Sequence, residues 1–216
     1  LAKEIYLAAK GGDPDPANNA ALRMVIEKAK AENMPKSNIE NAINKAKSKA
    51  GGDNFEAIRY EGYGPGGIAI MIDCLTDNKN RTASFVRSTL SKRGGNLGTA
   101  GSVSYLFKRK GVLVLENSYD EDEIMNKVLE LDIDDFRSED DSYIIETTPD
   151  NFLAIKDELE QNGYDKFITS EVTYVADNYI SLDEETCRKA MNLIEELEDL
   201  DDVNAVYHNL EVDINE

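Results

Sequence analysis

The chain has 216 residues, of which 41% are hydrophobic, and a formal net charge of -19 at pH 7. This length suits one or two domains with ordinary cores, and no apolar run reaches the roughly 18 residues of a membrane-spanning helix. We therefore exclude a helical membrane protein. We expect a cytoplasmic protein, because no signal peptide is visible and Cys74 and Cys187 lie among apolar residues, as buried free thiols do.

Residues 1–50 predict a bundle of three short helices. The first spans residues 1–10 before Gly11–Gly12, and the second follows a turn at 13–16, where proline suits the first helical turn. The third begins at a capping box over Ser37–Glu40. Their apolar residues recur at helical spacing, which gives each helix one narrow face to bury.

Residues 51–110 predict a β-α-β unit after a glycine-rich linker at 50–53. The apolar, β-branched run Ile68–Leu75 is typical of a buried strand. Alternating side chains over Ser102–Phe107 predict a second strand.

A helix is expected between these two strands. Asp77 or Asn80 can cap its start, and it ends at about Arg93 before a glycine pair. Three of its apolar residues are predicted to face inward: Phe85, Val86 and Leu90.

Residues 111–175 follow the order β-α-β-β-α-β of a complete ferredoxin-like unit. Residues 176–216 then predict a strand at Tyr179–Leu182, a helix, and a strand at Val203–His208. This last set can complete the half unit of residues 51–110, with the first ferredoxin-like unit inserted between the halves. The predicted class is α+β, with an N-terminal three-helix bundle followed by two ferredoxin-like units, one inserted in the other.

Charge is divided unevenly along the chain. Residues 1–50 carry nine Lys/Arg and six Asp/Glu, and residues 51–110 carry nine and five. Residues 111–216 carry six and 32. A basic first half and a strongly acidic second half are typical of a protein with one face for nucleic acid and another that repels it. Ordinary surface variation in a highly soluble protein is the alternative.

Basic side chains are the strongest functional signal. Phosphate contacts from Lys and Arg set affinity without reading sequence, and no helix rich in Arg, Asn or Gln suggests base-specific readout. The predicted contacts are Lys36, Lys45, Lys47, Lys49, Lys79, Arg81, Arg87, Lys92, Arg93, Lys108, Arg109 and Lys110. The lysines at 45–49 could instead interact with the C-terminal dipole of their helix. The hypothesis requires a continuous positive surface that neighbouring carboxylates leave open.

Glycine loops and tyrosines give weaker signals. The loops at 64–67 and 94–101 could cradle phosphate, but neither has a nucleotide-binding fingerprint, and tight turns are the favoured interpretation. Tyr60 and Tyr63 could stack on bases or pack within the protein.

No catalytic or metal site is predicted. Nucleophilic catalysis needs a base beside the nucleophile, and the one histidine of the chain, His208, lies on a predicted strand. Acidic runs such as Asp120–Glu123 lack the spacing of a calcium loop. We therefore predict no enzyme activity, no metal and no cofactor.

Several stretches resemble the YebC family: YEGYGPGG from Tyr60, CLTDNKNRT from Cys74, and GGNLG and GSVSYLF after Gly94. The match extends to Asn33–Lys36 and Leu197–Val203. The family includes bacterial proteins called probable transcriptional regulators and a mitochondrial activator of translation of a cytochrome oxidase subunit. Its members usually begin with a Lys/Arg/His-rich lead that is not seen here, so we expect a longer natural chain.

The resemblance implies three domains. They are a basic helical bundle at 1–50, a discontinuous ferredoxin-like platform at 51–110 and 176–216, and an inserted acidic ferredoxin-like domain at 111–175.

We predict a non-enzymatic, nucleic-acid-binding regulator of gene expression. The resemblance implies two versions, a ribosome-associated translation factor that contacts ribosomal RNA or tRNA and a DNA-binding transcriptional regulator. The charge favours RNA, since duplex DNA repels a strongly acidic body, whereas a structured RNA can be contacted on one face. A ligand-sensing or protein-interaction module is the alternative from another class. The sequence specifies no oligomeric state.

Overall fold

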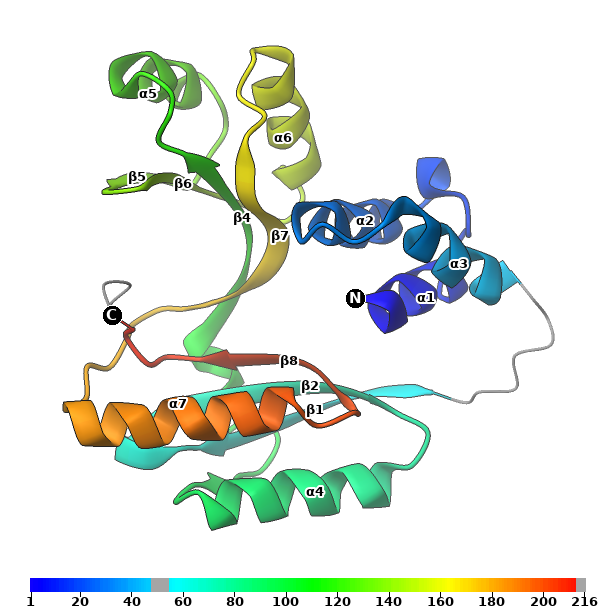
Figure 1. The fold of residues 1–216 in the computed structure, drawn as a ribbon, viewed down its shortest axis with the longest axis vertical. Helices are drawn as coiled ribbons and strands as arrows, with labels where there is room; N and C mark the ends of the chain where they lie inside the picture. The colour runs from blue at the N-terminus through cyan, green and yellow to red at the C-terminus, as the bar shows by residue number, and fades with distance from the viewer. Residues whose placement is uncertain (48–54, 213–216) are drawn as a thin grey trace. The chain divides into compact units, whose positions relative to one another are not determined.

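The computed structural model describes residues 1–47 and 55–212 and divides into two compact units (Figure 1). The first unit contains Leu1–Gly51 and Arg109–Thr173. The second, which we call the platform unit, contains Gly52–Lys108 and Tyr174–Glu216. The linker predicted at 50–53 lies outside the described residues.

Three helices form the N-terminal bundle: α1 (Ala2–Lys10), α2 (Ala20–Ala31) and α3 (Lys36–Lys47). The side chain of Asn19 joins α1 to α2, because its Oδ1 accepts from the Leu22 N–H and its Nδ2 donates to the Ala8 carbonyl. The capping box predicted at Ser37 is wrong. Since α3 already begins at Lys36, Ser37 lies inside the helix.

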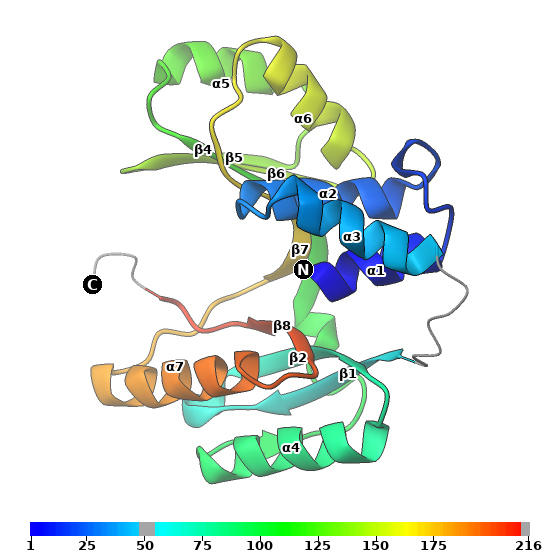
Figure 2. The ribbon, with the colours of Figure 1, turned by 45° about the vertical axis from the view of Figure 1, so that its right-hand side comes forward.

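The rest of the first unit is a four-stranded sheet with two helices. Its elements are β4 (Phe107–Glu116), α5 (Glu121–Leu129), β5 (Asp135–Glu139), β6 (Ser142–Thr147), α6 (Phe152–Gln161) and β7 (Phe167–Ala176). The strand order β5-β6-β4-β7 is that of a ferredoxin-like unit. Figure 2 shows α5 and α6 beside this sheet, and a core of apolar residues such as Leu113, Ile124 and Phe152 joins the layers.

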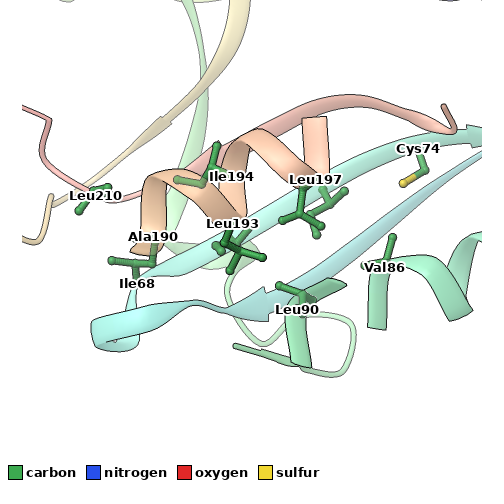
Figure 3. Close-up of a cluster of buried hydrophobic side chains, with 11 residues drawn as sticks. Ile68, Cys74, Val86, Leu90, Ala190, Leu193, Ile194, Leu197 and Leu210 are labelled. Atoms are coloured by element: carbon green, nitrogen blue, oxygen red, sulfur yellow. The ribbon is translucent and has the colours of Figure 1, made fainter. Parts of the chain in front are cut away.

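The platform unit contains the second sheet. Its elements are β1 (Glu56–Tyr63), β2 (Ala69–Thr76), α4 (Lys79–Lys92), β3 (Asn96–Leu97), α7 (Glu184–Glu198) and β8 (Val203–His208). The strand order is β3-β1-β2-β8, with antiparallel neighbours. Helices α4 and α7 pack through Leu90 and Leu193 on the face of β2 that carries Cys74 (Figure 3). The predicted α+β class, with N-terminal helices and two sheets, is confirmed.

Two strand predictions in the platform unit need correction, and one strand was not predicted. No strand was expected before the glycine loop at 64–67, but β1 is a full strand whose charged residues obscured its alternation. The strand predicted at Ser102–Phe107 is mostly a 3-10 turn, Ser104–Leu106, and β4 begins at Phe107. Tyr179–Leu182 contributes only an isolated bridge, from Ile180 to Leu210.

Gly95 is required by a close backbone approach, and its replacement by alanine is expected to destabilise the platform unit by about 3 kcal/mol. A Cβ there would lie 2.4 Å from the carbonyl oxygen of Tyr63, a backbone atom that cannot rotate away. The matched control is Gly101→Ala. Gly101 has φ +87° but open space around it, so only conformational strain of about 1 kcal/mol is expected. Urea unfolding should separate the two variants, and equal losses would contradict the steric explanation.

Candidate nucleic-acid interface

Helix α4 carries the densest group of predicted phosphate contacts. Lys79, Arg81, Arg87 and Lys92 lie on it, Arg93 is its C-cap, and the helix contains no Asp or Glu. Its inner side is held against the sheet by buried residues: Thr82, Val86, Thr89 and Leu90. The outer side of α4 is therefore a cationic surface with a fixed position on the platform unit.

The start of α4 is fixed by Asn78, not by Asp77 or Asn80 as predicted. Asn78 has an extended backbone, and its Oδ1 accepts from the Arg81 N–H at 3.1 Å. Behind this cap, the buried Thr82 hydroxyl lies 2.7 Å from a carboxylate oxygen of Asp202. The first turn of α4 is thus tied to the segment that precedes β8.

Most of the predicted cations have carboxylate partners. Glu196 on α7 lies 2.5 Å from Arg93 and 3.7 Å from Lys92, and Arg81 binds Asp77 and Asp202. The other pairs are Lys36–Glu40, Lys79–Glu56, Lys108–Asp177 and Lys110–Asp134. Exposed pairs of this kind contribute little, about 0–1 kcal/mol, so a phosphate can compete with the carboxylate. They nevertheless interrupt the open positive surface that the hypothesis requires.

Three of these seven carboxylate partners come from the end of the chain: Asp177, Glu196 and Asp202. Residues 176–216 carry two Lys/Arg and 13 Asp/Glu, and they fold into the same unit as α4. The acidic half of the sequence is therefore not confined to the inserted domain.

Four predicted contacts have no carboxylate within ion-pair distance in the part of the chain that the structure describes: Lys45, Lys47, Arg87 and Arg109. Lys45 and Lys47 lie exposed in the last turn of α3, and Arg109 lies exposed on β4. Arg87 is the exposed cation of α4 that no described carboxylate neutralises. Lys49 lies outside the described residues.

Tyr60 and Tyr63 are half-buried and pack against cores of the platform unit. Tyr60 packs against the core between α4 and α7, and burial raises the pKa of its hydroxyl, an effect that nearby Arg87 opposes. Tyr63 packs against a cluster that contains Ala69 and Met71, and its hydroxyl donates to the Ser102 carbonyl at 3.3 Å. Both rings therefore have a packing role.

The exposed aromatic rings are at other positions. Phe85 is 52% exposed, so its predicted inward orientation is wrong. The buried side of α4 consists of Val86 and Leu90 together with two threonines, Thr82 and Thr89. Its apolar stripe is therefore narrower than the sequence suggests. Tyr105, predicted within a strand, is 72% exposed on the 3-10 turn.

Glu61 is a buried residue whose role the sequence did not suggest. Its side chain is 5% exposed and accepts three backbone N–H groups, from Gly101 at 2.6 Å, Val103 at 3.1 Å and Ser104 at 2.6 Å. Burial alone would raise its pKa, but these three hydrogen bonds outweigh burial and lower it. A carboxylate of the protein thus occupies N–H donors that a phosphate would need, and the loop that follows Gly98 is a structural turn.

The residues considered for catalysis lie in the platform unit, where Cys74 is buried and Cys187 and His208 are half-buried. Burial lowers the pKa of His208, and its Nδ1 accepts from the Leu210 N–H at 3.1 Å. Cys74 and Cys187 are free thiols, and burial raises the pKa of Cys74 to about 12. Among the described residues, no group of three or more His, Cys, Asp or Glu side chains is arranged to hold a metal ion. None of the helices described has the length and apolarity needed to cross a membrane.

Comparisons with known proteins agree with this fold. A family model described as "TACO1/YebC second and third domain" matches residues 55–210, and "TACO1/YebC protein N-terminal domain" matches residues 1–49. A crystal structure of a conserved hypothetical protein from Aquifex aeolicus has a TM-score of 0.85 and 40% identity. That comparison covers 100% of this chain and 90% of the other.

Sequence relatives carry a regulatory name. A "probable transcriptional regulatory protein" of Geobacillus kaustophilus is 53% identical over 214 residues, 98% of this chain and 87% of the relative. One of Hathewaya histolytica is 49% identical over 213 residues, 98% of this chain and 86% of the relative. The two family models together span both units, so this chain belongs to the YebC family.

Proposed function

We propose that this chain is a non-enzymatic regulator of gene expression that binds structured RNA, as a translation factor acting with the ribosome in the cytoplasm. The observation that carries the proposal is α4, a 14-residue helix with four Lys/Arg and no Asp/Glu. Such a surface attracts a phosphate backbone without reading its sequence.

The site consists of α4 with Arg87 at its centre. We propose Lys45 and Lys47 of α3 as separate phosphate contacts on the first unit. We propose the functional modules 1–50, 51–110 with 176–216, and 111–175. The strong negative charge of residues 111–216 would repel nucleic acid from those residues, although residues 176–216 share the unit of α4. Contact limited to the cations of α4 suits a folded RNA that is contacted on one face.

A second candidate is a DNA-bound transcriptional regulator, which the name shared by the relatives favours. The two candidates differ in their preferred ligand. Competition between a structured RNA and a duplex DNA of matched length, at one fixed salt concentration, separates them. Tighter binding of the duplex would favour the second candidate.

Replacing Arg87 with glutamine is expected to reduce the salt dependence of RNA binding. Loss of one phosphate contact lowers the slope of log K against log salt by roughly 0.7 on a single strand and by roughly 0.9 on a duplex. Fluorescence anisotropy with a labelled RNA hairpin over a salt series measures this slope.

Arg188→Gln is the matched control. Arg188 is an exposed arginine of the same unit, but it lies on the acidic helix α7 and pairs with Glu184 at 3.1 Å. Its loss should leave the slope unchanged, whereas equal slopes for wild type and Arg87→Gln would reject the α4 site. Arg81 is a poor probe, because its replacement would also leave Asp202 without its ion-pair partner.

A further inference from the structure

A cleft of about 510 Å³ opens beside α4 within the platform unit. Arg81, Thr82 and Phe85 of α4 form one wall, and Asp199–Val203, the turn between α7 and β8, forms the other. The proposed RNA contact centres on Arg87, which is not among the residues that line this cleft.

The cleft carries a net negative charge although an arginine lines it. The Arg81 guanidinium is shared between two carboxylates, with Asp77 at 2.8 Å and Asp202 at 3.1 Å, so its charge is already matched. Asp199 on the opposite wall is exposed and has no ion pair among the described residues. A phosphate entering the cleft would meet more carboxylate than guanidinium charge.

The surroundings of the second wall strengthen this negative potential. No Lys or Arg follows Lys189 in the sequence, whereas six Asp/Glu occur between Glu195 and Asp202. Burial raises the pKa of Glu198, and the charges of Asp199 and Glu195 raise it further. The wall therefore favours a positively charged ligand.

Phe85 gives the cleft a surface for such a ligand. Half of this side chain is open to solvent, although neighbouring positions of α4 are polar. The face of an aromatic ring attracts a guanidinium or ammonium group, and the alkyl stem of arginine or lysine packs on apolar surface. An aromatic wall opposite a carboxylate wall is thus complementary to a long basic side chain.

We infer that this cleft binds an arginine or lysine side chain from a basic, extended segment of a partner protein. The guanidinium or ammonium group lies over the Phe85 ring and reaches the Asp199 carboxylate. This contact is separate from the proposed RNA contact, so one platform unit can hold RNA and a basic protein segment together.

A labelled peptide of alternating glycine and arginine tests the site by fluorescence anisotropy. Phe85→Leu keeps an apolar side chain but removes the ring, and Asp199→Asn keeps the shape but removes the charge. Each should weaken peptide binding by about 2–5-fold, whereas Phe85→Tyr, which keeps an aromatic ring, should bind the peptide as tightly as the wild type. Glu184→Gln is the control, since Glu184 is an exposed carboxylate of α7 outside the cleft.

Unchanged peptide affinity in both Phe85→Leu and Asp199→Asn would overturn the inference, as would an equal loss in Glu184→Gln. A cleft that takes RNA instead would show a different pattern, in which Phe85→Leu weakens oligouridylate binding and leaves the peptide unaffected. The RNA proposal is judged by the salt slope of Arg87→Gln, so one proposal can fail without the other.

Discussion

Replacing Glu61 with leucine is expected to lower the free energy of unfolding of the platform unit by on the order of 3–5 kcal/mol. The substitution leaves three backbone N–H groups, those of Gly101, Val103 and Ser104, without the carboxylate that accepts them. Unpaired buried donors lose their hydrogen bonds to water without compensation. Urea unfolding at neutral pH, followed by the circular dichroism of the sheet and helices, measures the loss.

The Glu61 carboxylate also makes the free energy of unfolding depend on pH. Because the pKa of Glu61 in the folded protein lies below its ordinary value of 4.5, its contribution is complete above that value and is lost as pH falls through the lower, folded pKa. Glu61→Leu should therefore flatten the loss of stability in acid. Glu56→Leu, an exposed position of the same strand paired with Lys79, should cost less than about 1 kcal/mol and keep the acid dependence. Equal losses of stability and equal acid dependence in the two variants would show that the hydrogen bonds to Glu61 do not hold the loop.

Lys156→Ala is expected to destabilise the first unit by about 3–5 kcal/mol. The Lys156 side chain of α6 is 7% exposed and pairs with Glu27 of α2, with Glu160 at 3.6 Å. Burial raises the pKa of Glu27, but its interactions with Lys156, and to a smaller extent with Lys30, together outweigh burial and lower it. Truncation leaves this carboxylate partly buried without its main partner, which weakens the attachment of the helical bundle to the inserted sheet.

Lys30→Ala is the control for Lys156. Lys30 also pairs with Glu27, at 3.2 Å, but its side chain is 61% exposed. Loss of an exposed pair costs about 0–1 kcal/mol, so burial should separate the two lysines in urea unfolding. Equal losses would mean that Lys156 adds nothing beyond a surface ion pair.

The helices and the ferredoxin-like order of residues 111–175 could be predicted because local signals agree there. Residues such as Asp120 and Asp183 cap their helices through side-chain oxygens, and these caps sit just before amphipathic stretches. β1 was missed because Arg59 and Glu61 interrupt its apolar pattern. Their charges are matched by partners distant in sequence, Asp73 for Arg59 and the N–H groups of the glycine loop for Glu61.

The candidate site was predictable residue by residue but not as a surface. The sequence identifies each cation, and α4 places five of them on one element or at its end. It does not reveal that Glu196 and Asp202, more than a hundred residues later, pair with three of those cations. The acidic cleft could not be predicted either, since it forms only when the α7–β8 turn lies beside Phe85.

The pairing of β2 with β8 sets an order of events while the nascent chain is made. Ile70 pairs with His208, so β2 leaves the exit tunnel long before its neighbour is synthesised. The last residue of the first unit is Thr173, so this unit can fold before the platform unit is fully synthesised. Until the last residues of β8 emerge, one edge of an almost wholly apolar strand stays open, which makes truncated or stalled products of this chain prone to aggregation and dependent on chaperones.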